Sequence, residues 1–462
     1  MTSVTDMKQS ARDTTKLQEI ASRFASKAKP GEEIEIYVSQ GSDVEIAIYK
    51  GEVENMTTAN STAVGIRIIN DHREGSAWAE SVDEDILEET LANARENASI
   101  AEPDEFAAMV KPSDIDDVVP MTRNGWDDSI FDLSLEEKID LAIELEKKAR
   151  SFDNRIVDVP SADYEDGWGH SVVANSHGIT VTNSSTSASL SASLMLGDVD
   201  PLESNGFSFG RGIKTLSSDE VIDMAFSRGV RLLGGTQPIS ESIPVILDPL
   251  VATQFFGIIS GMLSGGAVAK GRALLSDRLG DTIGNSKLTL IDDPTNENAF
   301  TSASYDAEGM PTRRNVFLEN GTLNQFAHTM YSSRRLKMKP NGCAKRGGVA
   351  SRPGAGMRAM YAVPTGESVE EIFQRVGEAI YVQHFLGVHS GVNALSGDFS
   401  VGVQGVWIRD GQWSESFKEA TIASDLLTML SRTSAIANDT WWLPGSIVGN
   451  TVLIDEMVMT GK

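Results

Sequence analysis

Residues 381–411 constrain the fold of this chain more than any other stretch. Two apolar runs, at 379–386 and 399–408, flank a polar stretch rich in Gly, Asn, Ser and Asp, which predicts a strand, a loop and a second strand. In the second run large apolar residues alternate with small ones, so one face of the strand lets another backbone lie close. Asp410 and Gly411 supply the positive φ angles that a tight hairpin needs. The C-terminal half is therefore predicted to be rich in β-structure.

Length and composition indicate a globular protein with more than one domain. A chain of 462 residues is too long for one ordinary core, and 40% apolar with 23% charged residues is typical of folded proteins. A net charge of −26 repels nucleic acid and anionic membranes. The single cysteine, Cys343, excludes an internal disulfide and suits a reducing compartment, and residues 1–13 lack the apolar core of a secretory signal. We therefore expect a cytoplasmic protein.

The first half shows helical and strand patterns in an order that occurs twice. Helices are predicted at 14–29, 82–100, 134–150 and 217–233. Short strands are predicted at 34–38, 44–49, 63–69, 75–79, 156–159, 171–175, 180–183 and 187–196. This order predicts an α+β layer domain with a mixed or antiparallel sheet at 1–235, built by rough duplication. Residues 234–238 are the predicted linker, and 239–462 are predicted to form a β-rich, barrel-like domain.

Several motifs occur together in the order of a known family. Residues 391–411 read G-V-N-A-L-S-G-D-F-S-V-G-V-Q-G-V-W-I-R-D-G. Upstream are I-D-D-P-T at 291–295, Y-D-A-E-G-M-P-T-R-R at 305–314, L-E-N-G-T-L at 318–323 and, more weakly, G-I-R-I-I at 65–69. Over nearly its whole length the chain thus resembles the TldD/PmbA family, once called modulators of DNA gyrase. The resemblance implies an intracellular metallopeptidase-type protein, in which paralogous TldD and TldE (PmbA) subunits form a heterodimer that trims or degrades unfolded peptides.

The resemblance also implies a zinc site in TldD-type subunits, whose motif this chain lacks. Such subunits bind zinc through H-E-x-x-x-H on a helix and a distant cysteine, because two imidazoles on one helix reach one ion while the glutamate takes a proton from the bound water. The matching stretch here, 256–261, reads F-G-I-I-S-G, and 441–450 contain no cysteine. The chain therefore resembles the TldE/PmbA type. We expect no catalytic residue, metal site or cofactor in it, with zinc only in a TldD-type partner.

His384 and His389 recur at a five-residue interval. In a strand this spacing places two side chains on opposite faces, and no carboxylate lies between them. A metal site at this pair is therefore disfavoured.

The glycine-rich face of 391–405 is the predicted place for an extended peptide. A peptide could join an exposed strand edge there, because backbone hydrogen bonding tolerates any sequence. The candidate peptide-binding residues are Asn393, Ser396, Gly397, Asp398, Ser400, Gly402, Arg313 and Arg314. The expected partners are a TldD-type subunit and an extended peptide substrate, with a homodimer when the chain is isolated and no membrane partner.

The segment 313–358 departs from the acidic balance of the chain, with ten Lys or Arg residues and one acid, Glu319. It could hold nucleic acid. However, the segment contains only three Phe, Tyr or Trp residues, Phe317, Phe326 and Tyr331, so it offers few side chains on which bases could stack. A docking face for an acidic partner, or for the carboxylates of a peptide, is favoured over nucleic acid.

Two further patterns have both a functional and a structural interpretation. Asp292, Asp293, Asp306 and Glu308 could bind a hard cation or act as acid and base, but ordinary turn chemistry is favoured. Residues 249–269 carry no charge and place glycines at a four-residue interval, which suits either a membrane span or a buried helix packed through its glycine face. The buried helix is favoured.

Three functions are consistent with these patterns. The first is a TldE/PmbA-like, non-catalytic subunit of an intracellular TldD/TldE-type metallopeptidase complex that processes or degrades unfolded peptides. The second is a binding protein without protease function, or a homodimer, that acts on another partner through the basic segment. The third is an independent hydrolase, which is disfavoured because no Ser, His and Asp set carries a nucleophile-elbow motif.

Overall fold

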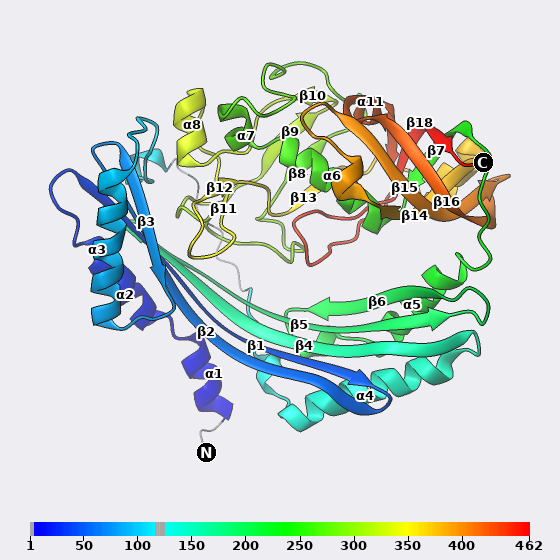
Figure 1. Cartoon of the computed structure of the whole chain (residues 1–462), viewed down its shortest axis with the longest axis horizontal. Coiled ribbons are helices and arrows are strands. Elements are labelled where there is room, and N and C mark those ends of the chain that lie inside the picture. Colours follow the sequence, from blue (N-terminus) through cyan, green and yellow to red (C-terminus); the bar gives the residue numbers. More distant parts are fainter. Residues whose placement is uncertain (1–3, 116–117, 119, 121–124) are drawn as a thin grey trace.

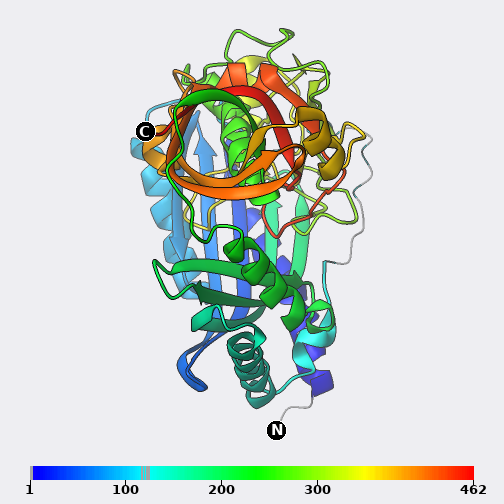
Figure 2. The ribbon, with the colours of Figure 1, turned by 90° about the vertical axis from the view of Figure 1, so that its right-hand side faces the viewer.

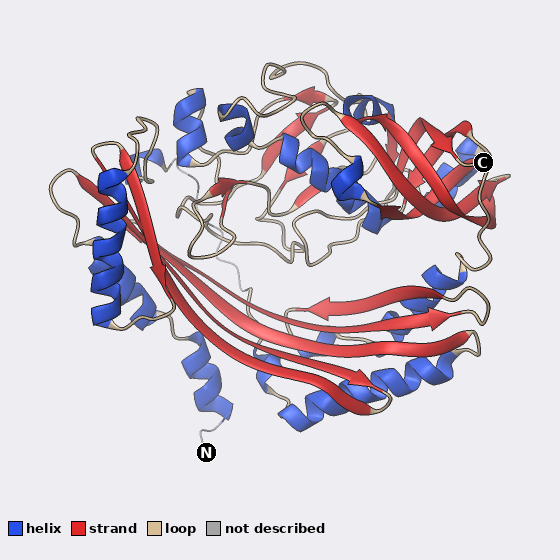
Figure 3. Cartoon of the chain, in the orientation of Figure 1, coloured by secondary structure: helices blue, strands red, loops and turns tan. Residues whose placement is uncertain are grey.

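The computed structural model describes residues 4–115, 118, 120 and 125–462 and has the predicted mixed α+β architecture (Figures 1 and 3). The first half of the chain forms a long, curved sheet with helices on its outer side (Figure 1). The second half lies over the inner side of that sheet (Figure 1). The two halves therefore meet across the face of the sheet that carries no helices.

The sheet of the first half is antiparallel throughout, in the strand order β3-β2-β1-β4-β5-β6. Its strands are β1 (Glu32–Tyr49), β2 (Glu52–Asn70), β3 (Arg73–Ala79), β4 (Ile156–Asn175), β5 (Thr180–Leu196) and β6 (Leu202–Gly210). The accompanying helices are α1 (Val4–Arg12), α2 (Thr15–Ala25), α3 (Glu84–Ile100), α4 (Leu135–Phe152) and α5 (Ser218–Val230), with short 3-10 turns η1 (Pro112–Asp114), η2 (Asp128–Phe131) and η3 (Ile213–Thr215). Part of the passage between α3 and α4 lies outside the described residues.

The helices cover two apolar clusters on one face of the sheet. One cluster lies between α2, α3 and strand residues such as Ile34, Ile36 and Val38. The other lies between α4, α5 and the strand residues of β4 and β5. Successive side chains of a strand point to opposite faces, so Glu35 and Tyr37 point toward the second half. The alternation of residues 34–38 thus decides which side of β1 meets helices and which meets the other half.

The order helix, strands, helix occurs twice, as the sequence predicts, but each unit has three strands where four short ones are predicted, and β6 is not among the predicted strands. The two units, α2 to α3 and α4 to α5, join where β1 pairs antiparallel with β4. The predicted break between strands 34–38 and 44–49 is wrong, because β1 runs unbroken from Glu32 to Tyr49. Gly41 and Ser42 stay extended because β2 and β4 both pair with them.

The second half contains the predicted barrel. Strands β16, β15, β14, β7 and β18 pair in that order, and β16 also pairs with β18, which closes the ring seen in Figure 2. The strands of this sheet are β7 (Glu241–Leu247), β14 (Ala379–Leu386), β15 (Asp398–Arg409), β16 (Gln412–Asp425), β17 (Thr433–Ile436) and β18 (Val452–Thr460). Asp410 and Gly411 turn the chain between β15 and β16 with φ of 50° and 69°, which confirms the predicted hairpin.

Smaller elements lie beside the barrel. The strands are β8 (Leu290–Asp292), β9 (Asn315–Glu319), β10 (Thr322–Leu323), β11 (Ala344–Lys345), β12 (Gly354–Ala355) and β13 (Met360–Ala362). The helices are α6 (Pro249–Met262), α7 (Gly265–Ala269), α8 (Met330–Leu336), α9 (Val369–Val376), α10 (Val388–Gly391) and α11 (Leu426–Arg432). The chain passes from α5 to β7 through the predicted linker, and the domain boundary placed there stays a prediction.

The prediction of one buried helix packed through its glycines is wrong in two respects. The segment forms two helices, α6 and α7, and none of the helices described is long and apolar enough to cross a membrane. The core of the second half receives Phe255, Ile259 and Met262 of α6, whereas a Cβ added at Gly257 or Gly261 would meet open space. The large apolar residues of α6 are buried instead of its two glycines because they remove more apolar surface from water. The third glycine of the predicted face, Gly265 of α7, is buried, and a Cβ added there would lie 2.5 Å from His328 Nδ1.

Two glycine substitutions separate an open helix face from a close contact between the halves. We expect Gly257→Ala to raise the free energy of unfolding by about 0.5–1 kcal/mol, because alanine favours a helix and meets no atom there. We expect Gly65→Ala to lower it by roughly 1–3 kcal/mol, because its Cβ would lie 2.2 Å from the Val349 carbonyl oxygen. Urea denaturation of both variants checks the pair. Equal effects would contradict this assignment of the two faces.

Candidate functional site

A buried carboxylate on β1 joins the two halves of the chain. Arg67 of β2 donates to Glu35 through Nε (3.2 Å) and Nη2 (3.0 Å), and Arg346, which follows β11, donates to the same carboxylate. The Glu35 side chain is 0% exposed. Burial by itself would raise the pKa of Glu35, but the Arg346 and Arg67 guanidiniums outweigh it and hold that pKa below its usual range. The carboxylate is therefore an ionised link between the halves.

Other cations of the basic segment 313–358 also contact the first half. Arg352 Nε lies 3.2 Å from Glu74 Oε1 on β3, and Arg334 of α8 donates to the Ala107 carbonyl oxygen at 3.0 Å. The acids and carbonyl groups that receive these arginines belong to the same chain. At least three of the ten cations in the segment predicted to dock an acidic partner therefore contact the first half of the same chain, and charge counts alone do not indicate this internal contact.

Of the carboxylates predicted to serve turns, Asp293 and Asp306 do so, whereas Asp292 lies in β8 and Glu308 accepts from the distant Met330 N–H group; all four are buried. Asp306 Oδ1 accepts from the Glu308 and Met310 backbone N–H groups at 2.9 Å, and Asp292 Oδ1 accepts from the Arg358 and Ala359 N–H groups. Burial raises the pKa of Asp292 to about 6, only partly opposed by those N–H groups. It also raises the pKa of both Asp306 and Glu308.

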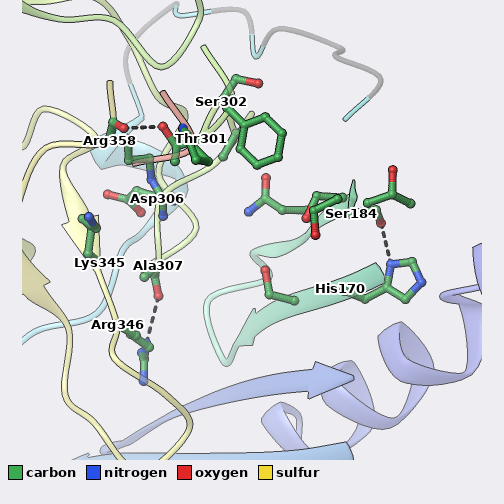
Figure 4. Close-up of a pocket in the computed structure, with 18 of the residues that line it drawn as sticks. His170, Ser184, Thr301, Ser302, Asp306, Ala307, Lys345, Arg346 and Arg358 are labelled. Atoms are coloured by element: carbon green, nitrogen blue, oxygen red, sulfur yellow. Dashed lines mark hydrogen bonds between the residues drawn. The ribbon is translucent and has the colours of Figure 1, made fainter. Parts of the chain in front are cut away.

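A polar cavity of about 420 Å³ lies between the halves (Figure 4). One wall comes from the second half and includes Asp306, Lys345, Arg346 and Arg358. The opposite wall comes from β4 and β5 and is rich in hydroxyl and amide groups; it includes His170, Ser171, Asn183, Ser184, Ser185, Thr186 and Ser187. In Figure 4 the labelled residues of the second half lie on one side of this space, and His170 and Ser184, which are hydrogen-bonded to each other, lie on the other. The cavity can therefore hold a small polar ligand.

Sequence reasoning missed most of this cavity. Glu35 and Arg67 alternate with Ile residues, which usually indicates a strand with one solvated face. The hydroxyl-rich run in β5 was visible in the sequence, but nothing in it indicates what faces it. The ion pairs between the halves join residues more than 300 positions apart, such as Arg346 and Glu35, so no local sequence pattern indicates them.

The structure places the predicted peptide-binding residues in two separate segments. Asn393, Ser396 and Asp398 form one compact loop, in which Asn393 Oδ1 accepts from the Ser396 N–H at 3.3 Å and Ser396 Oγ donates to Asp398 at 2.5 Å. Gly397 has φ of 91° and completes the turn of that loop. Ser400 and Gly402 follow on β15. Their role in peptide binding stays a prediction.

Arg313 and Arg314 lie elsewhere, directly before β9. The Arg313 carbonyl oxygen accepts from Asn315 Nδ2 at 3.2 Å, and the same amide donates to the Asn341 carbonyl oxygen and contacts Cys343 Sγ. Asn315 therefore links the Arg313 backbone to the surroundings of the buried cysteine, whereas Arg314 is exposed.

The expected free strand edge at 391–405 is wrong. Gly402 of β15 pairs with Leu386 of β14 on one side and with Thr421 of β16 on the other. Ahead of that point, Val392 bridges to Phe399 and covers the remaining side. The barrel closes this edge because each of its strands pairs with two neighbours.

The residues present do not fit the zinc set of a TldD-type subunit. The outward side of α6 carries Gly257 and Gly261, which offer no ligand atom. In the parts of the chain that the structure describes, His, Cys, Asp and Glu form no group of three or more that could hold a metal ion. His384 lies on β14 and His389 in α10, and Cys343 is buried, with its thiol pKa raised by burial. We therefore derive no chemical step through zinc in this chain.

Comparison with known proteins gives matches along the chain. Three family models match: the PmbA/TldA metallopeptidase domain 1 at residues 34–98, the central domain at 128–233 and the C-terminal domain at 240–461. Metalloprotease PmbA of Escherichia coli O157:H7 is 29% identical over 93% of this chain and 92% of its own length. The metalloprotease TldD homologue of Haemophilus influenzae is 21% identical over 87% of this chain and 85% of its own.

Solved structures share the fold. A putative modulator of DNA gyrase from Thermotoga maritima has a TM-score of 0.86 at 22% identity, covering 96% of this chain and 100% of the other. TldE from Thermococcus kodakarensis has a TM-score of 0.82 at 21% identity, covering 96% of this chain and 99% of the other.

Removing the Glu35 charge should loosen the contact between the halves. We expect Glu35→Gln to lower the free energy of unfolding by about 3–5 kcal/mol, because two buried guanidiniums lose their common carboxylate. Guanidinium chloride denaturation measures the loss. Glu52→Gln, at an exposed position on β2, is the matched control and should change stability by less than about 0.5 kcal/mol. Similar values for the two variants would contradict the role given to Glu35.

Asp292 should make stability depend on pH. Its pKa is 3.8 when unperturbed and about 6 in the folded protein, so its contribution is fully present below pH 4 and is lost as the pH rises through 6. Relative to Asp292→Asn, the wild type should therefore lose about 2 kcal/mol between pH 4 and pH 7, most of the total that follows from about 1.36 kcal/mol per pKa unit. Denaturation at several pH values tests this, with the exposed Asp277→Asn as control. Parallel pH profiles for wild type and Asp292→Asn would refute it.

Proposed function

Because the chain belongs to the PmbA/TldA metallopeptidase family, we propose that it is the TldE/PmbA-type subunit of a TldD/TldE-type complex that processes or degrades unfolded peptides in the cytoplasm. In this proposal a TldD-type partner carries the zinc and performs hydrolysis, and this chain has no cofactor of its own. Relatives named PmbA, TldD and TldE all align over most of the chain, which supports a partnership within this family.

The outward side of α6 is the observation that carries the proposal. The stretch that corresponds to H-E-x-x-x-H reads F-G-I-I-S-G, and it lies on α6. In this correspondence the two histidines fall on Phe256 and Gly261, and the glutamate falls on Gly257. Gly257 and Gly261 have open space beside them, whereas Phe256 is buried. This chain keeps the helix but has a buried Phe and two glycines in place of the two histidines and the glutamate base. A non-catalytic role is therefore the simplest account of its chemistry.

The binding-protein alternative is less well supported. It needs the basic segment to be available to another molecule, yet Arg346, Arg352 and Arg334 contact the first half of the same chain. In the proposed complex, the loop with Asn393, Ser396, Gly397 and Asp398 remains the candidate contact for an extended peptide.

Zinc content and peptide cleavage test the proposed function. The isolated chain should contain less than stoichiometric zinc by mass spectrometry and should leave an unfolded peptide intact, because it lacks the ligands and the base. Cleavage should appear when the cognate TldD-type chain is added. A TldD-type chain with its zinc-motif glutamate changed to glutamine is the control and should give no cleavage in the mixture. Zinc-dependent cleavage by the isolated chain would overturn the proposal.

A further inference from the structure

The cavity between the halves is rich in positive charge although the whole chain carries −26. Its lining includes four cationic side chains, those of Arg211, Lys345, Arg346 and Arg358, and one carboxylate, that of Asp306. Both Asp306 oxygens accept backbone hydrogen bonds, Oδ1 from Glu308 and Met310 and Oδ2 from Ala344. The carboxylate is therefore already held by backbone groups.

The four cations differ in what they already contact. Arg346 pairs with Glu35, and Arg211 donates to the Phe300 and Thr186 carbonyl oxygens. Lys345 Nζ donates to the Met357 carbonyl oxygen at 3.1 Å and to Ser446 Oγ at 2.7 Å. Each of these three cations thus has at least one partner within the chain. Three of the four therefore have a clear structural role.

Arg358 is held less completely. Its Nη2 has one long contact, 3.5 Å to the Ala344 carbonyl oxygen, and its Nε is buried without a hydrogen-bond partner within the described residues. A buried guanidinium donor without an acceptor costs free energy, which an anion in the cavity would recover. Burial and the nearby Arg358 charge also lower the pKa of Lys345, so an anion between these walls would relieve repulsion.

The opposite wall of the cavity, formed by β4 and β5, offers uncharged hydrogen-bond donors. Ser185 and Ser187 of β5 line the cavity and are exposed, whereas the Ser184 hydroxyl is hydrogen-bonded to His170 Nδ1 at 2.7 Å on the same wall (Figure 4). A volume of about 420 Å³ is enough for a ligand of about two or three amino acids. Hydroxyl groups can donate to a carboxylate or to peptide carbonyl oxygens without adding charge.

We propose that this cavity binds the carboxylate end of a short peptide, with Arg358 as its charged partner and the β5 hydroxyl groups as neutral donors. The identification of the ligand as a peptide rests on the proposed function, whereas the preference for an anion rests on the cavity. A singly charged carboxylate fits better than a phosphate dianion, because Asp306 lines the cavity and Asp292 accepts from the Arg358 backbone N–H.

Calorimetric titration of the isolated full chain tests the proposal with three probes. These are N-acetyl-Ala-Ala with a free carboxylate, the same dipeptide as its C-terminal amide, and inorganic phosphate. We expect the acid to bind at least ten times more tightly than either of the others. Equal binding of acid and amide, no binding of the acid, or tighter binding of phosphate would overturn it.

Two variants place the binding in this cavity. Arg358→Gln should weaken binding of the acid at least tenfold, whereas Arg375→Gln, on the exposed side of α9, should leave it unchanged. Ser185→Glu keeps the fold because position 185 is exposed, and its negative charge should weaken binding similarly. Thr57→Glu, exposed on β2, is its control. Circular dichroism establishes that each variant is folded, and unchanged affinity in folded Ser185→Glu and Arg358→Gln would refute the site.

This result is independent of zinc and of a partner. If the carboxylate binds but the TldD-type chain restores no cleavage, the proposed function fails and the anion site stands. If cleavage is restored but acid and amide bind equally, the carboxylate site fails and the proposed function stands.

Discussion

The fold depends on one buried carboxylate that is shared by two arginines. Glu35 accepts from Arg67 on the neighbouring strand and from Arg346 in the second half, so it links the sheet to the second half at a buried point. Removing three charges from water is costly, and the cost is offset only if the groups meet in good geometry. The relative placement of the halves is therefore tightly constrained, since any shift between them would separate these groups.

The same interface creates the candidate site. Asp292, Asp306 and Glu308 of the second half are buried near it, and burial raises the pKa of each. The contact between the halves also encloses the hydroxyl-rich wall of β5 opposite Arg358. The cavity exists only because the two halves meet there, so its ligand affinity and the stability of the interface are coupled.

Patterns within one segment predicted the local structure well. The hairpin at Asp410 and Gly411, the repeated order of helices and strands and the closed β-rich half all follow from residues close together in sequence. Predictions that depended on which other segment packs beside a residue were less successful. The strand break near Gly41, the glycine face of α6 and the free edge of β15 are each overturned by what lies beside them.

The sequence by itself determined the family, the α+β class and the absence of the zinc motif from 256–261, because these depend on which residues occur and in what order. Only the tertiary structure decided that the basic segment contacts its own sheet, that Arg358 faces a cavity and that Glu35 is buried. Those properties arise from residues hundreds of positions apart, and burial changes the energy of a charge according to its neighbours in space.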